Sequence, residues 1–135
     1  MKSSIVAILG VCLLLLVGCG KNVQVKGKVT FEDGSPLTTG MVIFQAGSTQ
    51  SKAPIEEDGS YVVGTLKADD GLPRGTYQVY ITGAVEVSGI SVTGAMLAPP
   101  VELIDSKFTK PETSGLTVEV KGRTTYDITV TPPGK

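Results

Sequence analysis

Cys19 is the residue to which the sequence assigns the most definite chemistry. It closes the run Leu16-Val17-Gly18-Cys19, which follows a basic Lys2 and an apolar stretch that begins at Ile5. A basic start, an apolar stretch, small residues and a cysteine are the order of a bacterial lipoprotein export signal. Small Gly18 suits a peptidase pocket that admits only small side chains before the cut. The Cys19 thiol then forms a thioether to a diacylglyceryl group. The sequence therefore predicts cleavage between Gly18 and Cys19 and lipidation of Cys19.

The apolar stretch from Ile5 to Val17 has the length of a secretory signal rather than of a membrane span. It covers about 13 residues, whereas a helix needs roughly 20 to cross a bilayer. A short buried helix or an uncleaved anchor is the alternative, but a buried helix would show a polar face, and this stretch has none. We therefore predict a signal peptide over residues 1–18, and a lipidated cysteine with a short tether over residues 19–22.

Processing determines where the chain goes and which chemistry remains. Two or more acyl chains give stable membrane anchoring, at about 0.8 kcal/mol per buried methylene. The predicted location is the cell envelope, with attachment to a membrane through the lipid on Cys19. Gly20 follows the cysteine instead of the Asp that retains enterobacterial lipoproteins in the inner membrane, so an outer membrane is favoured where the cell has one. Cys12 lies in the signal peptide, so the mature chain is expected to have no disulfide and no cysteine metal ligand.

Several kinds of active site are excluded or disfavoured by composition. The 135 residues include no histidine, which removes Ser-His-Asp and Cys-His catalysis and histidine-based zinc sites. Acids cluster at 56–59 and 69–71, but neither cluster has the calcium-loop spacing, and ordinary solvated turns explain both. A pair of glycosidase-type carboxylates would need a cleft. The formal net charge of −1 gives no basic surface for nucleic acid. We expect no enzyme activity, no metal, no cofactor and no nucleic-acid partner.

The mature chain has the alternation of β-strands, and no segment after residue 22 keeps a helical period. Polar and apolar residues alternate over 23–32, 77–82, 116–120 and 126–130, whereas 41–44 is apolar on both faces. Asp58-Gly59 predicts a hairpin between 55–57 and 61–65, while 47–53 and 66–75 are predicted as loops. The favoured fold is all-β: a single antiparallel Greek-key β-sandwich of about seven strands over residues 23–132. An open barrel of the oligonucleotide-binding type is the alternative.

Two regions outside this pattern offer a surface for a partner. Tyr80 falls on the polar face of its strand, where an exposed ring could stack on a sugar or a protein; packing against a cross-strand neighbour is the other interpretation. The long segment 84–113 is rich in Gly, Ala, Val and Pro, and loops of that length are often functional. We predict a hairpin in 84–93 that turns at Ser88-Gly89, followed by irregular chain over 94–113.

Five short motifs in order resemble carboxypeptidase regulatory-like domains. The opening is Val25-Lys26-Gly27-Lys28-Val29-Thr30-Phe31, followed by Asp33-Gly34-Ser35-Pro36-Leu37 and then Gly40-Met41-Val42-Ile43-Phe44. The middle is Glu57-Asp58-Gly59-Ser60-Tyr61, followed by Gly71-Leu72-Pro73-Arg74-Gly75-Thr76-Tyr77. Ser114-Gly115-Leu116-Thr117-Val118-Glu119-Val120 is similar to the ending of small bacterial lipoproteins of this type. The resemblance implies a transthyretin-like (prealbumin-like) sandwich without catalytic residues, in which Tyr61 and Tyr77 pack inward with their hydroxyls at the edge.

These observations support three hypotheses about function. The leading one is a membrane-anchored, non-catalytic envelope lipoprotein that acts as a structural or interaction module, with an envelope protein or a polysaccharide as partner. The alternative is a cell-surface carbohydrate-binding module, which depends on Tyr80, the segment 84–113 and analogy of fold. The third is a small hydrolase or a calcium-dependent factor.

Overall fold

The computed structural model describes residues 22–64, 71–87, 89, 91–94 and 98–134. The predicted signal peptide, Gly18, Cys19 and the acids Asp69 and Asp70 lie outside these residues. The described part forms ten strands and one short 3-10 helix. Within that part, no helix has the length and apolar character needed to cross a membrane.

The first sheet is built around β1 (Val25–Phe31). β4 (Ser60–Val62) pairs with β1 in the antiparallel sense, whereas β9 (Thr124–Thr125) and β10 (Ile128–Val130) pair with it in parallel. The prediction of a purely antiparallel fold is therefore wrong in this sheet. Almost the whole domain separates β1 from its parallel partners, so no hairpin fixes their relative direction.

The last predicted strand, 126–130, is shortened to β10, and the separate strand β9 precedes it. The two strands are separated at Tyr126 and Asp127, because a side chain replaces a backbone group in the ladder at this point. Tyr126 N donates to Lys26 O at 2.8 Å, but Lys28 N donates to the Asp127 carboxylate at 3.0 Å. The alternation over 126–130 gave no sign of this change of partner.

The second sheet is antiparallel throughout, in the order β3-β2-β5-β8. Its strands are β2 (Met41–Ala46), β3 (Thr49–Pro54), β5 (Gly75–Thr82) and β8 (Leu116–Val120). The prediction of a loop over 47–53 is wrong, because β3 pairs with β2 along its whole length. The inward residues of β3 include Ser51 and Ala53, which are buried. Both are too small and too weakly apolar to mark a strand by hydrophobic alternation.

The Asp58-Gly59 turn is present, but it does not form the predicted hairpin. Gly59 N donates to Glu56 O and Glu56 N donates to Ser60 O, at 2.9 and 2.8 Å. The turn instead carries the chain from β3 in the second sheet to β4 in the first, and beyond the turn the described residues join the two sides by the isolated bridge Lys52–Gly64 rather than by a ladder. It is therefore a corner between sheets.

The two sheets enclose one hydrophobic core, so the prediction of an all-β sandwich is confirmed and the barrel alternative is not observed. Tyr61 from the first sheet and Tyr77 from the second approach Phe44, with ring centroids 6.1 and 6.4 Å away. Such tilted and edge-on pairs stabilise a core beyond their buried area. Tyr61 and Tyr77 are almost fully buried, as expected, and their hydroxyls donate to the carbonyls of Tyr126 and Pro73.

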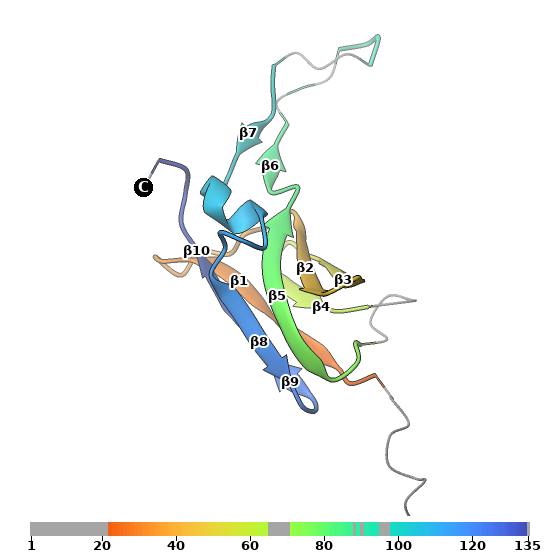
Figure 1. Ribbon diagram of the computed structural model, residues 1–135. Coiled ribbons are helices and arrows are strands. Elements are labelled where there is room, and N and C mark those ends of the chain that lie inside the picture. Colours follow the sequence, from red (N-terminus) through yellow and green to blue (C-terminus); the bar gives the residue numbers. More distant parts are fainter. Residues whose placement is uncertain (1–21, 65–70, 88, 90, 95–97, 135) are drawn as a thin grey trace, which may run out of the picture.

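A two-stranded ribbon extends beyond the sandwich. It consists of β6 (Val85–Glu86) and β7 (Val101–Glu102), which pair in the antiparallel sense, and Figure 1 shows it projecting at the end opposite the start of β1. The predicted hairpin within 84–93 is therefore wrong, since the partner of β6 lies at 101–102. The helix η2 (Ser106–Thr109) follows the ribbon, and its Phe108 joins the core.

Candidate functional site

The sandwich has two ends of different character. At the tether end the chain enters β1: Val23 exchanges backbone hydrogen bonds with Leu72 at 2.9 and 3.0 Å, and Thr124 N donates to Gln24 O at 2.9 Å. At the ribbon end β1 finishes and the ribbon projects (Figure 1). Asn22, where the described chain begins, therefore lies at the end away from the ribbon.

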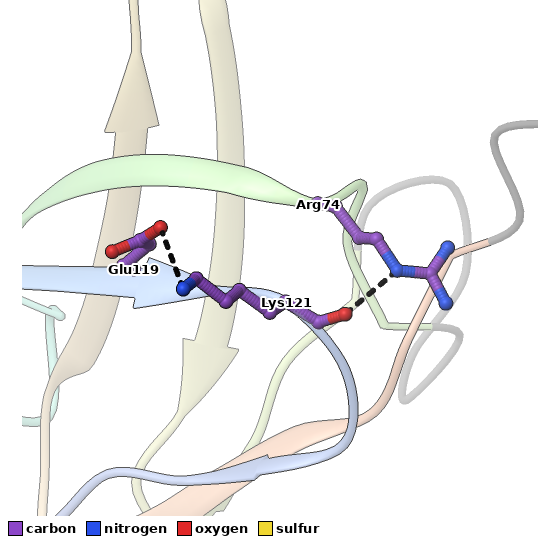
Figure 2. Close-up of polar contacts among 3 residues, drawn as sticks. All are labelled: Arg74, Glu119 and Lys121. Atoms are coloured by element: carbon purple, nitrogen blue, oxygen red, sulfur yellow. Dashed lines mark hydrogen bonds and ion pairs between the residues drawn. The ribbon is translucent and has the colours of Figure 1, made fainter. Parts of the chain in front are cut away.

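Basic side chains gather at the tether end. Figure 2 shows Arg74, whose Nε donates to the Lys121 carbonyl oxygen at 2.7 Å, and the Lys121 ammonium 3.5 Å from the Glu119 carboxylate. Both side chains of that ion pair are well exposed, so it contributes little to stability. Arg123 lies in the same β8–β9 turn as Lys121 and is exposed. Among the described residues, Arg74, Lys121 and Arg123 thus place cationic groups at this end.

A pocket of about 550 Å³ opens at the ribbon end, and we call it the ribbon-end pocket. Its walls come from the end of β1, the segment before β2, and the ribbon with the residue after it. They comprise Phe31, Pro36, Leu37, Thr38, Thr39, Val85, Glu86, Val87 and Leu103. A smaller pocket of about 230 Å³ shares Phe31 and is otherwise lined by Glu32, Asp33 and Pro132. Apolar walls with a few polar groups are typical of ligand sites.

The polar groups of the ribbon-end pocket have no partner within the described part of the protein. Glu86 forms no ion pair there, and the hydroxyls of Thr38 and Thr39 form no hydrogen bond. In the adjoining pocket, Asp33 accepts from the Ser35 hydroxyl and the Ser35 backbone N–H at 2.6 and 2.9 Å. These two bonds hold the pKa of Asp33 below its usual value. Asp33 is therefore charged at neutral pH.

The ribbon exposes apolar side chains. Val87, Val92 and Val101 keep 42%, 106% and 55% of their surface exposed, and they are the large exposed apolar residues of the described chain. All three lie in or between the strands of the ribbon. Grouped exposed apolar residues of this kind often mark an interaction surface, so the segment 84–113 supplies both a wall of the pocket and an apolar extension.

Tyr80 is not the exposed platform that its place on the polar face suggested. Only 9% of it is exposed, and Ile43 lies directly opposite it in the neighbouring strand. Its hydroxyl accepts from Gln50 Nε2 at 2.7 Å and donates to Gln45 Oε1 at 3.1 Å. The packing interpretation therefore describes its surroundings, and little of the ring is accessible for stacking.

The acids of the turns have structural partners. Asp58 accepts from the Ser60 backbone N–H and hydroxyl, which lowers its pKa. Within the described residues, no three acids, cysteines or histidines come together in a way that could hold a metal ion. Asp69 and Asp70 lie outside those residues.

The residues of the ribbon-end pocket were not singled out from the sequence. Phe31 was one more apolar position in the alternation over 23–32, and nothing in the sequence marked Glu86. They come together because β6 pairs with β7 across a long gap in sequence, and no local signal marks that pairing. The length of the segment 84–113 was the one useful sign.

Comparisons with known proteins give a limited result. No family model matches the chain, and no curated protein matches it significantly. Among solved structures, it is similar to a DUF3823 family protein from Bacteroides ovatus ATCC 8483, with 22% sequence identity and a TM-score of 0.45. The match covers 82% of this chain and 45% of that protein, so the chain spans less than half of that protein's length.

Proposed function

We propose that this protein is a lipid-anchored, non-catalytic interaction module of the bacterial cell envelope. The observation that carries the proposal is the opposition of the two ends: the chain enters at one end, and the ribbon-end pocket and the exposed valines of the ribbon lie at the other. A lipid on Cys19 would hold the tether end at the membrane. The ribbon end would then face away from the bilayer, where it can meet a partner.

Charge at the tether end supports this orientation. Arg74, Lys121 and Arg123 would lie near the headgroups if Cys19 is lipidated. Each basic side chain near an anionic leaflet contributes about 1 kcal/mol of attraction. The resemblance to carboxypeptidase regulatory-like domains of the transthyretin type supports the non-catalytic interaction role, because such domains usually accompany other modules and lack catalytic residues.

The anchor is tested by changing Cys19→Ser in the full chain and fractionating the cells. We expect the unmodified protein in the membrane fraction and the variant outside it, because the serine hydroxyl cannot form the thioether. Cys12→Ser is the matched control and should leave the distribution unchanged. Equal membrane association of the Cys19→Ser protein would overturn the anchor.

The interaction role is tested by photo-crosslinking from the ribbon in living cells. A photoreactive amino acid at Val92 should give discrete crosslinked species, whereas one at Lys121 should give mainly lipid adducts or none. Recovery of glycans in place of proteins would favour the alternative of carbohydrate binding, with the ribbon-end pocket in the role first considered for Tyr80. Absence of any adduct at Val92 would contradict the proposal.

A further inference from the structure

We infer that the ribbon-end pocket binds an extended peptide segment of a partner protein, one that presents an apolar side chain beside a lysine or arginine. This inference rests on the proposed function and names the chemistry of the partner. It combines three features of the pocket in the described part of the protein: apolar walls, backbone groups without a hydrogen bond along one side, and acidic side chains with no lysine or arginine in the lining.

The walls suit an apolar side chain. Phe31 and Leu103 contribute apolar surface from two separate segments, and Pro36 extends it. Leu37 is almost fully buried and holds its segment against the core, while Leu103 N donates to Ala84 O at 2.9 Å and fixes the base of the ribbon. The pocket is thus built on the sandwich, and an aliphatic or aromatic side chain of the partner would leave water on entering it.

The segment 37–40, which runs along the pocket, has backbone groups that can hydrogen-bond to a ligand. Leu37 N donates to Val29 O at 3.0 Å, and Gly40 O accepts from Ile55 N at 3.0 Å. Between these two bonds, Thr38 and Thr39 form no hydrogen bond to any other described residue, through either backbone or hydroxyl. An extended peptide can hydrogen-bond to such groups as an added strand does, with its alternate side chains entering the pocket.

Charge selects a basic partner. Glu86 lines the ribbon-end pocket, and Glu32 and Asp33 line the adjoining one. No lysine or arginine is among the residues that line either pocket, so their charge is not neutralised from within the walls. Charged groups at the rim of a site mainly determine which partners are accepted and how fast they arrive.

The test is a random peptide display library screened against the full-length lipoprotein in detergent micelles. We expect enrichment of peptides that carry an apolar residue next to Lys or Arg. Glu86→Lys should weaken the binding of these peptides about fivefold, and Val87→Ser should weaken it by a similar factor. Glu119→Lys is the matched control, because it reverses an exposed acid at the tether end, and it should leave binding unchanged.

The outcomes separate this inference from the proposed function. Enrichment of acidic peptides, enrichment that Glu86→Lys leaves intact, or no enrichment would each overturn the peptide site. Crosslinking from Val92 in cells would still report a partner that uses another surface, so the interaction role can survive the loss of this site. Binding to the unmodified protein should also weaken as salt is raised from 50 to 500 mM, which screens an exposed acid–base contact.

Discussion

At the scale of residues, single hydroxyl groups tie each sheet to a loop beside it through a hydrogen bond to a backbone carbonyl. The Tyr61 hydroxyl donates to the Tyr126 carbonyl, at the place where the parallel strands β9 and β10 separate. Ser114, which is buried, donates to the Val79 carbonyl at 2.5 Å and accepts from Leu116 N at 3.2 Å. Each hydroxyl thus has a backbone carbonyl as its acceptor, which matters because a buried hydroxyl without a partner is costly. The polar atoms of this core are therefore structural.

Tyr61→Phe tests the importance of such a bond and has a characteristic pH dependence. Loss of the bond to Tyr126 should lower the free energy of unfolding by about 1–3 kcal/mol at pH 7, because the carbonyl loses its donor. Burial raises the pKa of Tyr61 above its usual value of 10.0. The unfolded tyrosine therefore ionises before the folded one, and the stabilisation, complete below pH 10, is lost as the pH rises toward the folded pKa.

Urea unfolding of the two proteins between pH 7 and 11.5 measures this difference. Above pH 10 the unmodified protein should lose about 1.4 kcal/mol per pH unit more than the Tyr61→Phe protein. Tyr77→Phe is a second case, since burial raises the pKa of Tyr77 as well, and its loss should change the pH profile in the same direction. Parallel pH profiles for the unmodified and Tyr61→Phe proteins would show that Tyr61 ionises normally in the fold.

At the scale of elements, one sequence motif produces two turns with different surroundings. Asp33-Gly34-Ser35 and Asp58-Gly59-Ser60 each place the glycine at positive φ, +90° and +86°, and each aspartate accepts from the serine two residues later. The glycine of the first turn has free space around it, whereas Gly59 of the second turn lies against Val29 in β1 and against Pro36. A Cβ on Gly59 would lie 2.8 Å from the Val29 carbonyl oxygen and 2.9 Å from Pro36 Cβ, while one on Gly34 would meet nothing within 4 Å.

Gly34→Ala and Gly59→Ala are therefore a matched pair. Gly34→Ala should cost about 1 kcal/mol, the usual penalty of an L side chain in the left-handed region. Gly59→Ala should cost at least about 2 kcal/mol more, because the corner between the sheets must also move. Thermal melts followed by far-UV circular dichroism give both values, and equal losses would mean that the corner is not packed against β1 as described.

These turns also show how much of the molecule the sequence could predict. The strands β1, β5 and β8 were predicted because their inward residues are large and alternate with polar ones. The Asp58-Gly59 turn was also predicted from its residues. That it joins two sheets was not predicted, because the residues of a turn determine its local shape and do not determine which sheet the next strand enters. The strand β3 was missed because its inward residues are small and give no hydrophobic alternation. The ribbon-end pocket was missed because it depends on pairing Glu86 with Val101, residues far apart in sequence.

At the scale of the whole molecule, the sandwich and the ribbon have separate roles. No residue of β6 or β7 belongs to the core cluster or packs against it. Ala84, Leu103 and Ile104, which flank the two strands, are the points where the ribbon meets the core. The described residues of the ribbon are mostly exposed, and its three large valines face solvent. Stability therefore resides in the sandwich, and the ribbon can be selected for recognition.

Replacement of residues 87–100 by Asn-Gly tests this separation. Glu86 and Val101 are directly paired, so two residues between them complete a tight hairpin, and Asn-Gly suits the type I′ turn that such a hairpin needs. The shortened protein should keep its melting temperature within about 4 °C, because a change of 1 kcal/mol shifts the midpoint of a domain of this size by roughly that amount. The same protein should lose the peptide binding that depends on Val87. A fall of more than about 10 °C would mean that the ribbon supports the sandwich, and retained peptide binding would place the partner elsewhere on the surface.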